Sequence, residues 1–141
     1  MKVSIKKLHP DAKVPAYATP QAACFDLTAV TYDAESQSYG TGLAFEIPYG
    51  HVMLMYSRSG DGFKRGVRLA NCTGVIDSDY RGEVRVKMIR DDSTVGYRQT
   101  HKIGDRIAQA MIIPYPKVEF EAVESLTDTE RGDGGFGSTG A

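Results

Sequence analysis

Short runs that alternate apolar and polar residues dominate this chain of 141 residues. In the stretch VRVKM, Val84, Val86 and Met88 would share one face. Arg85 and Lys87 would point the other way, which is the two-residue period of a half-buried strand. Similar patterns predict strands in KVSIKKL, HVMLMYSR, RIAQAMIIPY and VEFEAV. Turn sequences such as SRSGDG, DSDYRG and KIGD separate these runs. The chain is therefore predicted to be all-β.

Helical periodicity is weak throughout the sequence. No window of a dozen residues holds a convincing 3.6-residue period, so at most one short helical turn is expected, near residues 59–64. Many short strands at uneven spacing favour a barrel or a jelly roll over a simple meander. We therefore predict a barrel or jelly-roll domain over residues 1–128, followed by a flexible, glycine-rich C-terminal arm over residues 129–141.

The composition narrows the class of protein. Hydrophobic residues make up 41% and charged residues 25%, which is typical of one globular domain of this length. A net charge of -1 argues against a surface that binds long nucleic acids. Cys24 and Cys72 are far apart, so a disulfide scaffold or a zinc site is not expected and a reducing compartment fits better. The start of the chain has no apolar leader and no run has membrane-spanning length. A cytoplasmic protein with no membrane partner is predicted.

The C-terminal sequence RGDGGFGSTGA needs a separate explanation. Gly132, Gly134 and Gly137 match the spacing G-x-G-x-x-G of a dinucleotide-binding turn. That turn works only between a strand and a helix, and four residues after Gly137 leave no room for a helix. The match therefore does not indicate dinucleotide binding. The arm still places an arginine, an aromatic ring and two hydroxyls at close spacing.

Two internal segments carry candidate polar groups after apolar runs. In ACFDLTA, Asp26 could cap a turn or offer a hard oxygen donor to Mg²⁺ or to its bound water. In YSRSGDGFKRG, Ser59 and Gly60 offer a hydroxyl and an unobstructed N–H to a phosphate oxygen, and Arg58 adds a planar cation. The alternative for this second segment is an ordinary Ser-Gly turn beside a solvated arginine.

The segment RLANCTGVIDSDYRGEVRV gives the strongest signal. GVID predicts a buried strand ending in Asp77, and a second strand from Glu83 would complete a hairpin around which Asn71, Asp77 and Tyr80 cluster. An aspartate at the end of an apolar run can act as a general base. Asn71 could read a pyrimidine edge and the Tyr80 ring could stack on a sugar. A polar hairpin tip with Asx turns is the alternative.

The segment KIGDRIAQAMI is less specific by itself. Asp105 and Arg106 would form a structural ion pair, and Gln109 would be an incidental amide on the following strand. The three histidines are isolated in the sequence and are predicted to be surface or packing residues. They are His9, His51 and His101.

Taken together and in order, these segments resemble the five motifs of the trimeric dUTPase family (deoxyuridine triphosphate nucleotidohydrolases). The matching stretches are ACFDL, SRSG, GVIDSDYRGE, GDRIAQ and RGDGGFGSTG, and they extend from residue 23 to residue 140. Two positions differ from the usual motifs, because Cys24 replaces a glycine and Ser57 replaces a proline. The stretch DGFKRGVRLAN after Gly60 also departs from the sequence that is common in the family.

The resemblance implies Mg²⁺-dependent hydrolysis of dUTP to dUMP and pyrophosphate, which limits uracil in DNA and supplies dUMP for dTMP synthesis. It implies that Asp77 orients and deprotonates the attacking water. It also implies that Asp26 holds Mg²⁺, through coordinated waters. The family further implies a distorted jelly-roll barrel for residues 1–128. It also implies a homotrimer with sites at subunit boundaries, in which the glycine-rich arm folds over the bound nucleotide.

The resemblance also implies a set of substrate-binding residues. Those expected near the phosphates are Arg58, Ser59, Gly60 and Gln109. Those expected around uracil and the sugar are Asn71, Gly74, Val75, Ile76 and Tyr80, with Arg85 close by. Those expected from the arm are Arg131, Phe136, Gly137, Ser138 and Thr139.

Two other functions fit parts of the sequence. A dCTP deaminase shares the fold, but it would need a glutamate base and a different loop at the pyrimidine edge. A nucleotide-gated regulatory protein would bind dUTP and signal through a partner surface. Release of pyrophosphate from dUTP without ammonia from dCTP would separate the two enzymes, and turnover of either kind would exclude a pure binding module.

Overall fold

The nine-residue strand β10 (Arg106–Pro114) organises the larger part of the fold. The structure is a computed structural model that describes residues 1–90 and 99–138. Strand β10 pairs antiparallel with β2 (Phe25–Thr28) on one side and with β6 (His51–Tyr56) on the other. Strand β8 (Thr73–Ile76) extends this sheet beyond β6, so its strand order is β2-β10-β6-β8.

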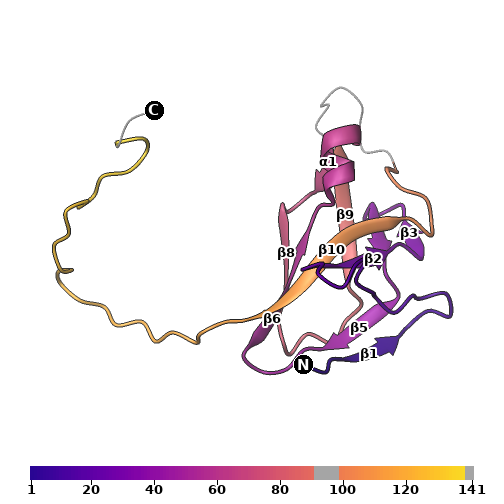
Figure 1. Cartoon of the computed structure of the whole chain (residues 1–141), viewed down its shortest axis with the longest axis horizontal. Helices are drawn as coiled ribbons and strands as arrows, with labels where there is room; N and C mark the ends of the chain where they lie inside the picture. The colour runs from indigo at the N-terminus through magenta and orange to yellow at the C-terminus, as the bar shows by residue number, and fades with distance from the viewer. Residues whose placement is uncertain (91–98, 139–141) are drawn as a thin grey trace.

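A second four-stranded sheet has the order β3-β4-β9-β7. Its strands are β3 (Thr31–Asp33), β4 (Ser38–Gly40), β9 (Arg85–Arg90) and β7 (Val67–Leu69). A two-stranded ribbon of β1 (Ser4–Lys7) and β5 (Leu43–Glu46) lies beside the sheets (Figure 1). The predicted all-β, distorted jelly-roll architecture is confirmed.

The core consists of the side chains that alternation assigns to one face of each strand. Val86 and Met88 of β9 are buried, as is Val84 just before the strand, which confirms the predicted period. The other large side chains that are almost fully buried come from both sheets and the ribbon. They include Leu27, Tyr39, Leu43, Met53, Leu69 and Ile107.

The predicted helical turn is confirmed as α1 (Ser59–Arg65). The helix ends at Gly66, whose φ of 59° is the left-handed conformation that glycine adopts without a Cβ penalty. Among the described residues α1 is the single α-helix, and no helix there is long and apolar enough to cross a membrane.

The predicted hairpin from GVID to the strand after Glu83 is wrong. Strand β8 pairs with β6, whereas β9 pairs with β4 and β7 in the other sheet. A turn in which the Tyr80 N–H donates to the Asp77 carbonyl starts the chain's passage between the two sheets. Alternation identifies which residues face the core, but it does not identify the partner of a strand.

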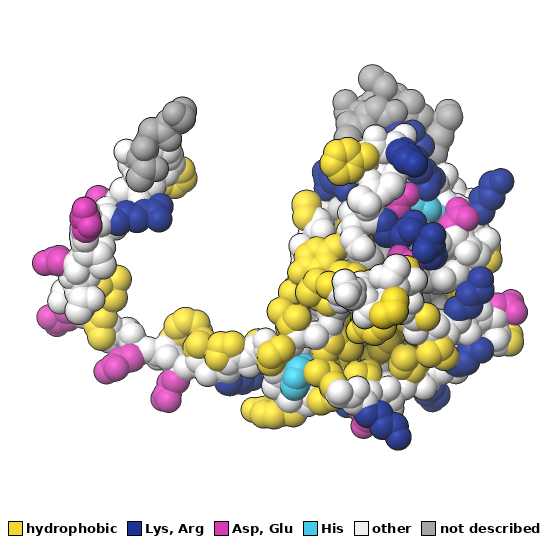
Figure 2. Space-filling view, viewed as in Figure 1, with side chains coloured by type: hydrophobic (Ala, Val, Ile, Leu, Met, Phe, Trp, Pro, Cys, Tyr) yellow, Lys and Arg dark blue, Asp and Glu magenta, His cyan; other side chains and the backbone are white. Residues whose placement is uncertain are grey.

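The predicted strand in VEFEAV is also wrong for the single chain. Residues 115–138 are all described and contain no strand, and they extend away from the body (Figure 1). Val118, Phe120, Val123 and Leu126 are exposed along this segment, as the apolar side chains in Figure 2 show. A strand needs a partner for its backbone groups, and the body of the same chain provides none for these residues in the described structure.

Gly42 provides a test of this packing. Its φ is +65°, and an added Cβ would lie 2.8 Å from the His9 Cβ and 2.9 Å from a Val30 methyl carbon. Gly50 has a similar φ of +78°, but nothing lies within 4 Å of its ideal Cβ. We expect Gly50→Ala to cost about 1 kcal/mol of unfolding free energy through backbone strain, and Gly42→Ala roughly 2–5 kcal/mol because overpacking adds to that strain.

Thermal and urea denaturation of the two variants would measure this difference. Equal losses of stability in both variants would contradict the close packing of the β5 ribbon on residues 9–12 and Val30.

Candidate active site

A row of side chains crosses the outer face of the β2-β10-β6-β8 sheet. Gln109 of β10 lies opposite Asp26 on one side and opposite Tyr56 on the other, and Tyr56 lies opposite Thr73 of β8. Residues directly opposite in antiparallel strands project from the same face of the sheet. The first and fourth motifs, which are far apart in the sequence, therefore meet at the β2 end of this row.

A β-bulge between β10 and β2 adds a second group to the row. Asp26 pairs with Gln109, but Thr28 pairs with Arg106 because the register shifts between Arg106 and Ala108. In a regular strand, Arg106 and Gln109 would face opposite sides, since they are three residues apart. The extra residue, Ile107, is fully buried, and Arg106 is turned to the face that carries Asp26.

Asp26 is bound by two guanidinium groups. Its Oδ1 accepts a hydrogen bond from Arg58 Nε at 2.9 Å, and its Oδ2 accepts one from Arg106 Nη1 at 2.9 Å. The side chain of Asp26 is 19% exposed, so these charge-assisted bonds are partly shielded from water. The predicted ion pair between Asp105 and Arg106 is wrong, because Asp105 Oδ2 instead accepts the Lys102 N–H at 2.8 Å.

The turn after β6 is held in place by hydrogen bonds at Ser57. Its carbonyl accepts Gln109 Nε2 at 3.0 Å, and its hydroxyl oxygen accepts the Leu69 N–H at 2.9 Å. Ser59 and Gly60 follow at the start of α1 and are exposed, and nothing lies within 4 Å of an ideal Cβ at Gly60. The turn therefore presents an open hydroxyl and an accessible backbone beside Arg58 and Gln109.

Strand β8 forms an edge of its sheet. It pairs with β6 on one side, and no described strand pairs with its other edge. Val75 is 60% exposed, while Gly74 is buried, and an added Cβ there would lie 2.5 Å from Met55 Cε. The backbone of residues 74–76 is thus held against the core by Gly74 while its open edge carries unpaired N–H and C=O groups.

The groups predicted to cluster at a hairpin are separated by this strand. Asn71 lies just before β8 and Asp77 lies just after it, and both are exposed. Tyr80 follows Asp77 in the turn, where its hydroxyl donates to the Glu83 carbonyl at 3.1 Å and its ring packs over Gly82. The predicted proximity of Tyr80 and Asp77 is confirmed, but the clustering of Asn71 with them is wrong.

One chain does not bring the two groups of candidate residues together. The row through Asp26 and Gln109 ends at Thr73, the first residue of β8, whereas Asp77 follows the last residue of that strand. Four residues at roughly 3.3 Å each place Asp77 about 13 Å along the strand from that row. The single chain therefore carries two half-sites. The phosphate half-site consists of the candidate phosphate donors around Asp26, and the other half-site consists of the β8 edge with the candidate base Asp77.

Arg85 is engaged within its own chain. Its Nη1 donates to Glu83 Oε2 at 2.8 Å, and its Nε donates to the Ser38 hydroxyl at 3.0 Å. These bonds tie β9 to β4 and fix the position of the guanidinium. Arg85 itself follows the Tyr80 turn closely in the sequence.

The arm residues lie apart from both half-sites. Arg131 Nε donates to the Gly134 carbonyl at 2.8 Å, and the Ser138 N–H donates to the Gly135 carbonyl. Phe136 is fully exposed in a left-handed backbone conformation with φ of 50°, and Gly137 follows it. Thr139 lies outside the described residues.

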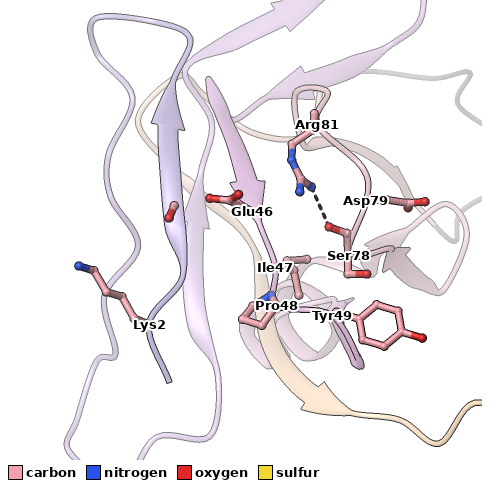
Figure 3. A pocket seen from close by; sticks show the side chains of 9 residues that line it. Lys2, Glu46, Ile47, Pro48, Tyr49, Ser78, Asp79 and Arg81 are labelled. Atoms are coloured by element: carbon pink, nitrogen blue, oxygen red, sulfur yellow. Dashed lines mark hydrogen bonds between the residues drawn. The ribbon is translucent and has the colours of Figure 1, made fainter.

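A shallow pocket of about 460 Å³ adjoins the Asp77 turn without including Asp77 (Figure 3). It is lined by Glu46, Tyr49, Asp79 and Arg81 among others. Arg81 Nη1 donates to the Ser78 carbonyl at 2.7 Å at its edge. None of the predicted site residues lines this pocket, so it is distinct from both half-sites.

The donors for a metal ion are few within one chain. No group of three or more His, Cys, Asp or Glu side chains gathers in residues 1–90 and 99–138. Asp26 is one partly buried carboxylate beside the phosphate-type donors, and hard oxygen is the ligand type that Mg²⁺ prefers. Asp26 is therefore the side chain of this half-site that would hold the ion, through waters that Mg²⁺ releases reluctantly.

Sequence reasoning missed a buried ionic network behind the turn of Ser59 and Gly60. Asp61 Oδ1 accepts a hydrogen bond from His101 Nε2 at 2.9 Å, and the two side chains are 3% and 1% exposed. His101 is a buried packing residue, as expected, but it is not isolated. The sequence GDG around Asp61 is typical of a solvated turn, so no pattern indicated this contact.

Comparisons with known proteins identify the family. A sequence model of the dUTPase family matches residues 10–140. Deoxyuridine 5'-triphosphate nucleotidohydrolase of Nautilia profundicola is 47% identical over 144 residues, covering 99% of each chain. The protein of the same name from Helicobacter hepaticus is 44% identical, covering 99% of this chain and 89% of its own.

Solved structures give the same result. The dUTPase of Staphylococcus bacteriophage 80alpha with dUPNHPP superimposes with a TM-score of 0.81 at 26% identity, covering 99% of both chains. A mutant dUTPase of S. aureus phage phi11, described with a structural Mg(II) ion, shares the fold with a TM-score of 0.71 at 22% identity, covering 89% of this chain and 98% of its own. The all-β fold and the family match over residues 10–140 place the chain among the nucleotide hydrolases. The chain belongs to the dUTPase family.

Cys24 reports on the electrostatics around Asp26. Burial raises the pKa of the Cys24 thiol, and the negative charge of Asp26 raises that pKa further. Because the thiolate is the reactive form, iodoacetamide at pH 8 should label Cys24 several-fold more slowly than the exposed Cys72. Asp26→Asn should accelerate labelling of Cys24 and leave Cys72 unchanged. Mass spectrometry of the two peptides would measure both rates, and identical rates for the two thiols would contradict this environment.

Proposed function

We propose that this dUTPase hydrolyses dUTP to dUMP and pyrophosphate in sites that two or more copies of the chain complete together. The observation that carries the proposal is the pair of half-sites on one sheet. One offers guanidinium, hydroxyl and amide donors around Asp26, and the other offers an open strand edge that ends in the exposed Asp77.

Asp77 acts as the general base. Its carboxylate accepts a proton from a water molecule whose oxygen attacks the α-phosphorus. The bond from the α-phosphorus to the bridging oxygen breaks, and pyrophosphate leaves. Asp77 is exposed at the end of β8, which leaves it accessible to water and to a nucleotide bound along the strand. A positioned base of this kind typically contributes about 10² to 10⁴ in rate.

The SRSG turn stabilises the charge that develops on the phosphates. Ser59 and the Gly60 N–H approach the oxygens nearest the scissile bond, and Arg58 and Gln109 add donors. Gln109 already bonds the Ser57 carbonyl, and Arg58 already bonds Asp26, so both side chains are oriented before a ligand binds.

Asp26 would hold Mg²⁺ through coordinated waters. The ion, when bound, neutralises phosphate charge and polarises the phosphoryl groups. Asp26 itself orients Arg58 and Arg106 on its two oxygens, which sets the positive charge that faces the triphosphate.

The open edge of β8 reads the base. Backbone groups of Gly74, Val75 and Ile76 and the side-chain amide of Asn71 pair with uracil, which rejects cytosine by hydrogen-bond mismatch. The Tyr80 ring, held over Gly82, packs under the sugar and leaves no room for a 2′-hydroxyl. Arg85 lies nearby, held by Glu83.

The arm over residues 129–141 closes the site. Phe136 stacks on uracil, while Arg131, Ser138 and Thr139 donate to the outer phosphates and Gly137 permits close approach of the backbone. In the single chain Phe136 is fully exposed and the arm extends away from the body, which supports closure over a different copy. Closure then excludes bulk water from the reaction.

A homotrimer in the cytoplasm is the assembly and location that we propose. About 13 Å along β8 separates Asp77 from the row through Asp26, a distance that a neighbouring subunit could close by supplying the complementary half-site. The exposed apolar side chains of Val118, Phe120, Val123 and Leu126 support contact with a neighbour, since several large apolar side chains exposed on one segment are unfavourable in water.

Asp77→Asn tests the chemistry. The amide keeps the shape of the side chain but does not accept the proton from water, so we expect pyrophosphate release from dUTP to fall by about 10² to 10⁴ while dUTP still binds. Pyrophosphate and ammonia would be measured with dUTP, UTP, dCTP and dTTP at fixed Mg²⁺, with binding followed by calorimetry. Glu35→Gln, at an exposed position far from Asp77 in the sequence, serves as the control. Near-normal turnover by Asp77→Asn would remove Asp77 from the mechanism, and ammonia from dCTP would indicate a deaminase.

Mixed trimers test the crossing arm. An Asp77→Asn chain lacks the base and a chain ending at Thr129 lacks the arm, so each homotrimer should be nearly inactive. When the two are unfolded together and refolded, some mixed trimers will hold a site with an intact Asp77 from one subunit and an intact arm from another. Activity should then rise well above the sum of the parents. Mixed trimers confirmed by native mass spectrometry but without activity would show that the arm serves its own chain's Asp77.

A further inference from the structure

Helix α1 has few ordinary reasons to be stable where it lies. It has seven residues, SGDGFKR, and two of them are glycines, each of which costs about 1 kcal/mol relative to alanine inside a helix. Helices this short are not stable without tertiary contacts. Yet Phe63 is 94% exposed, and Asp61 is the single buried residue of the seven, all of which are described. The attachment of α1 therefore depends on a carboxylate and not on apolar packing.

The contacts of Asp61 are an ion pair with Arg65 and a short hydrogen bond with His101. Oδ1 accepts hydrogen bonds from Arg65 Nη1 and from His101 Nε2, both at 2.9 Å. A carboxylate only accepts hydrogen bonds, so Nε2 of His101 carries a proton. Arg65 also donates through Nη2 to the Thr100 carbonyl. One carboxylate thus joins the two turns of α1 to the loop that leads into β10.

His101 is in turn fixed to the core. Its Nδ1 lies 2.9 Å from the Thr100 hydroxyl oxygen, and its backbone N–H donates to the Tyr39 hydroxyl at 2.8 Å. Tyr39 belongs to β4 and is 1% exposed. The network therefore runs from α1 through His101 to the second sheet, and Asp61 is the link that belongs to the phosphate half-site.

Stability alone does not explain this arrangement. Asp61 Oδ2 is buried and has no hydrogen-bond partner within the described parts of the chain. A buried polar atom without a partner is unfavourable, and an apolar side chain of similar size is often the more stable choice at such a position. The contact does fix the direction of α1, because a carboxylate between two N–H donors tolerates little displacement.

We propose that Asp61 is a positioning residue, which acts through His101 and Arg65 to hold Ser59 and Gly60 in the geometry that the phosphates require. Ser59 and Gly60 are the first two residues of α1, and the Asp61 and Gly62 N–H groups both donate to the Arg58 carbonyl. A displacement of α1 therefore moves the hydroxyl, the N–H and the arginine together. The inference rests on the proposed function, in which this turn stabilises phosphate charge.

Four single variants separate positioning from folding. Asp61→Asn keeps the shape but removes the charge. His101→Leu removes the donor to Asp61, while His101→Gln replaces it with an amide N–H. The control is Asp11→Asn, because Asp11 also lies beside a histidine, His9 at 3.9 Å, but is 81% exposed. All four would be assayed with dUTP as the full-length, assembled protein, well below the thermal midpoint of each.

We expect Asp61→Asn and His101→Leu to lower kcat by roughly 10- to 100-fold with a smaller change in KM, since misplacement of a catalytic group by about 1 Å can cost about 10²-fold. His101→Gln should recover much of the loss, and Asp11→Asn should behave as the wild type. If Asp61→Asn does not fold, the comparison of His101→Leu with His101→Gln decides the question. Unchanged kcat in Asp61→Asn, or equal kcat in the two His101 variants, would overturn the proposal.

A double-mutant cycle with Ser59→Ala gives the decisive measurement. If Asp61 acts through the turn, Asp61→Asn should reduce kcat far less in the Ser59→Ala background than in the wild type, because the group that it positions is already gone. Equal fold losses in both backgrounds would overturn the positioning role while leaving the role of Ser59 intact. Wild-type activity in Ser59→Ala alone would instead overturn the proposed role of Ser59, and the positioning role with it.

Discussion

The pairing register of β10 is the constraint on which the rest of the molecule depends. Its two neighbours, β2 and β6, carry Asp26 and the turn with Arg58, so their alignment on β10 decides which of these groups meet. A slip of one residue would turn every side chain of β10 to the opposite face. Ile107, Ala108 and Ala110 are fully buried, and this fixes the register through the core. The bulge after Arg106 then allows the arginine and the glutamine of one strand to reach the same face.

Much of the fold was predictable because it follows from the burial of one face of each strand. The period of two residues located β6, β9 and β10, and the scarcity of helical periods left room only for α1. The partner of each strand was not predictable in the same way. GVID lies in a strand, as predicted, but the strand is a sheet edge with Val75 60% exposed and not the buried strand that was expected. It pairs with β6 and not with the strand that follows it, since the order of strands depends on the whole chain. VEFEAV has the composition of a strand without a partner in its own chain.

The candidate site was likewise predictable only in part. The family resemblance pointed to Asp26, Arg58, Ser59 and Gln109, and the structure places Asp26 and Arg58 in contact and Gln109 beside the SRSG turn. The sequence could not show that Asn71 and Asp77 lie at opposite ends of β8, because that depends on where the strand begins and ends. It also could not show the contact between Asp61 and His101, which are 40 residues apart. Long-range polar contacts have no local period, so a single sequence does not predict them.

The open edge of β8 has a consequence for the solution behaviour of the protein. Unpaired N–H and C=O groups that can read a base can equally well pair with any other extended chain, which makes such an edge a starting point for aggregation. Strand β8 is only four residues long, and the negatively charged Asp77 follows it directly. Short length and a terminal charge are the features by which proteins discourage edge-to-edge association. The residue proposed as the general base therefore also protects the edge of β8 against unwanted partners.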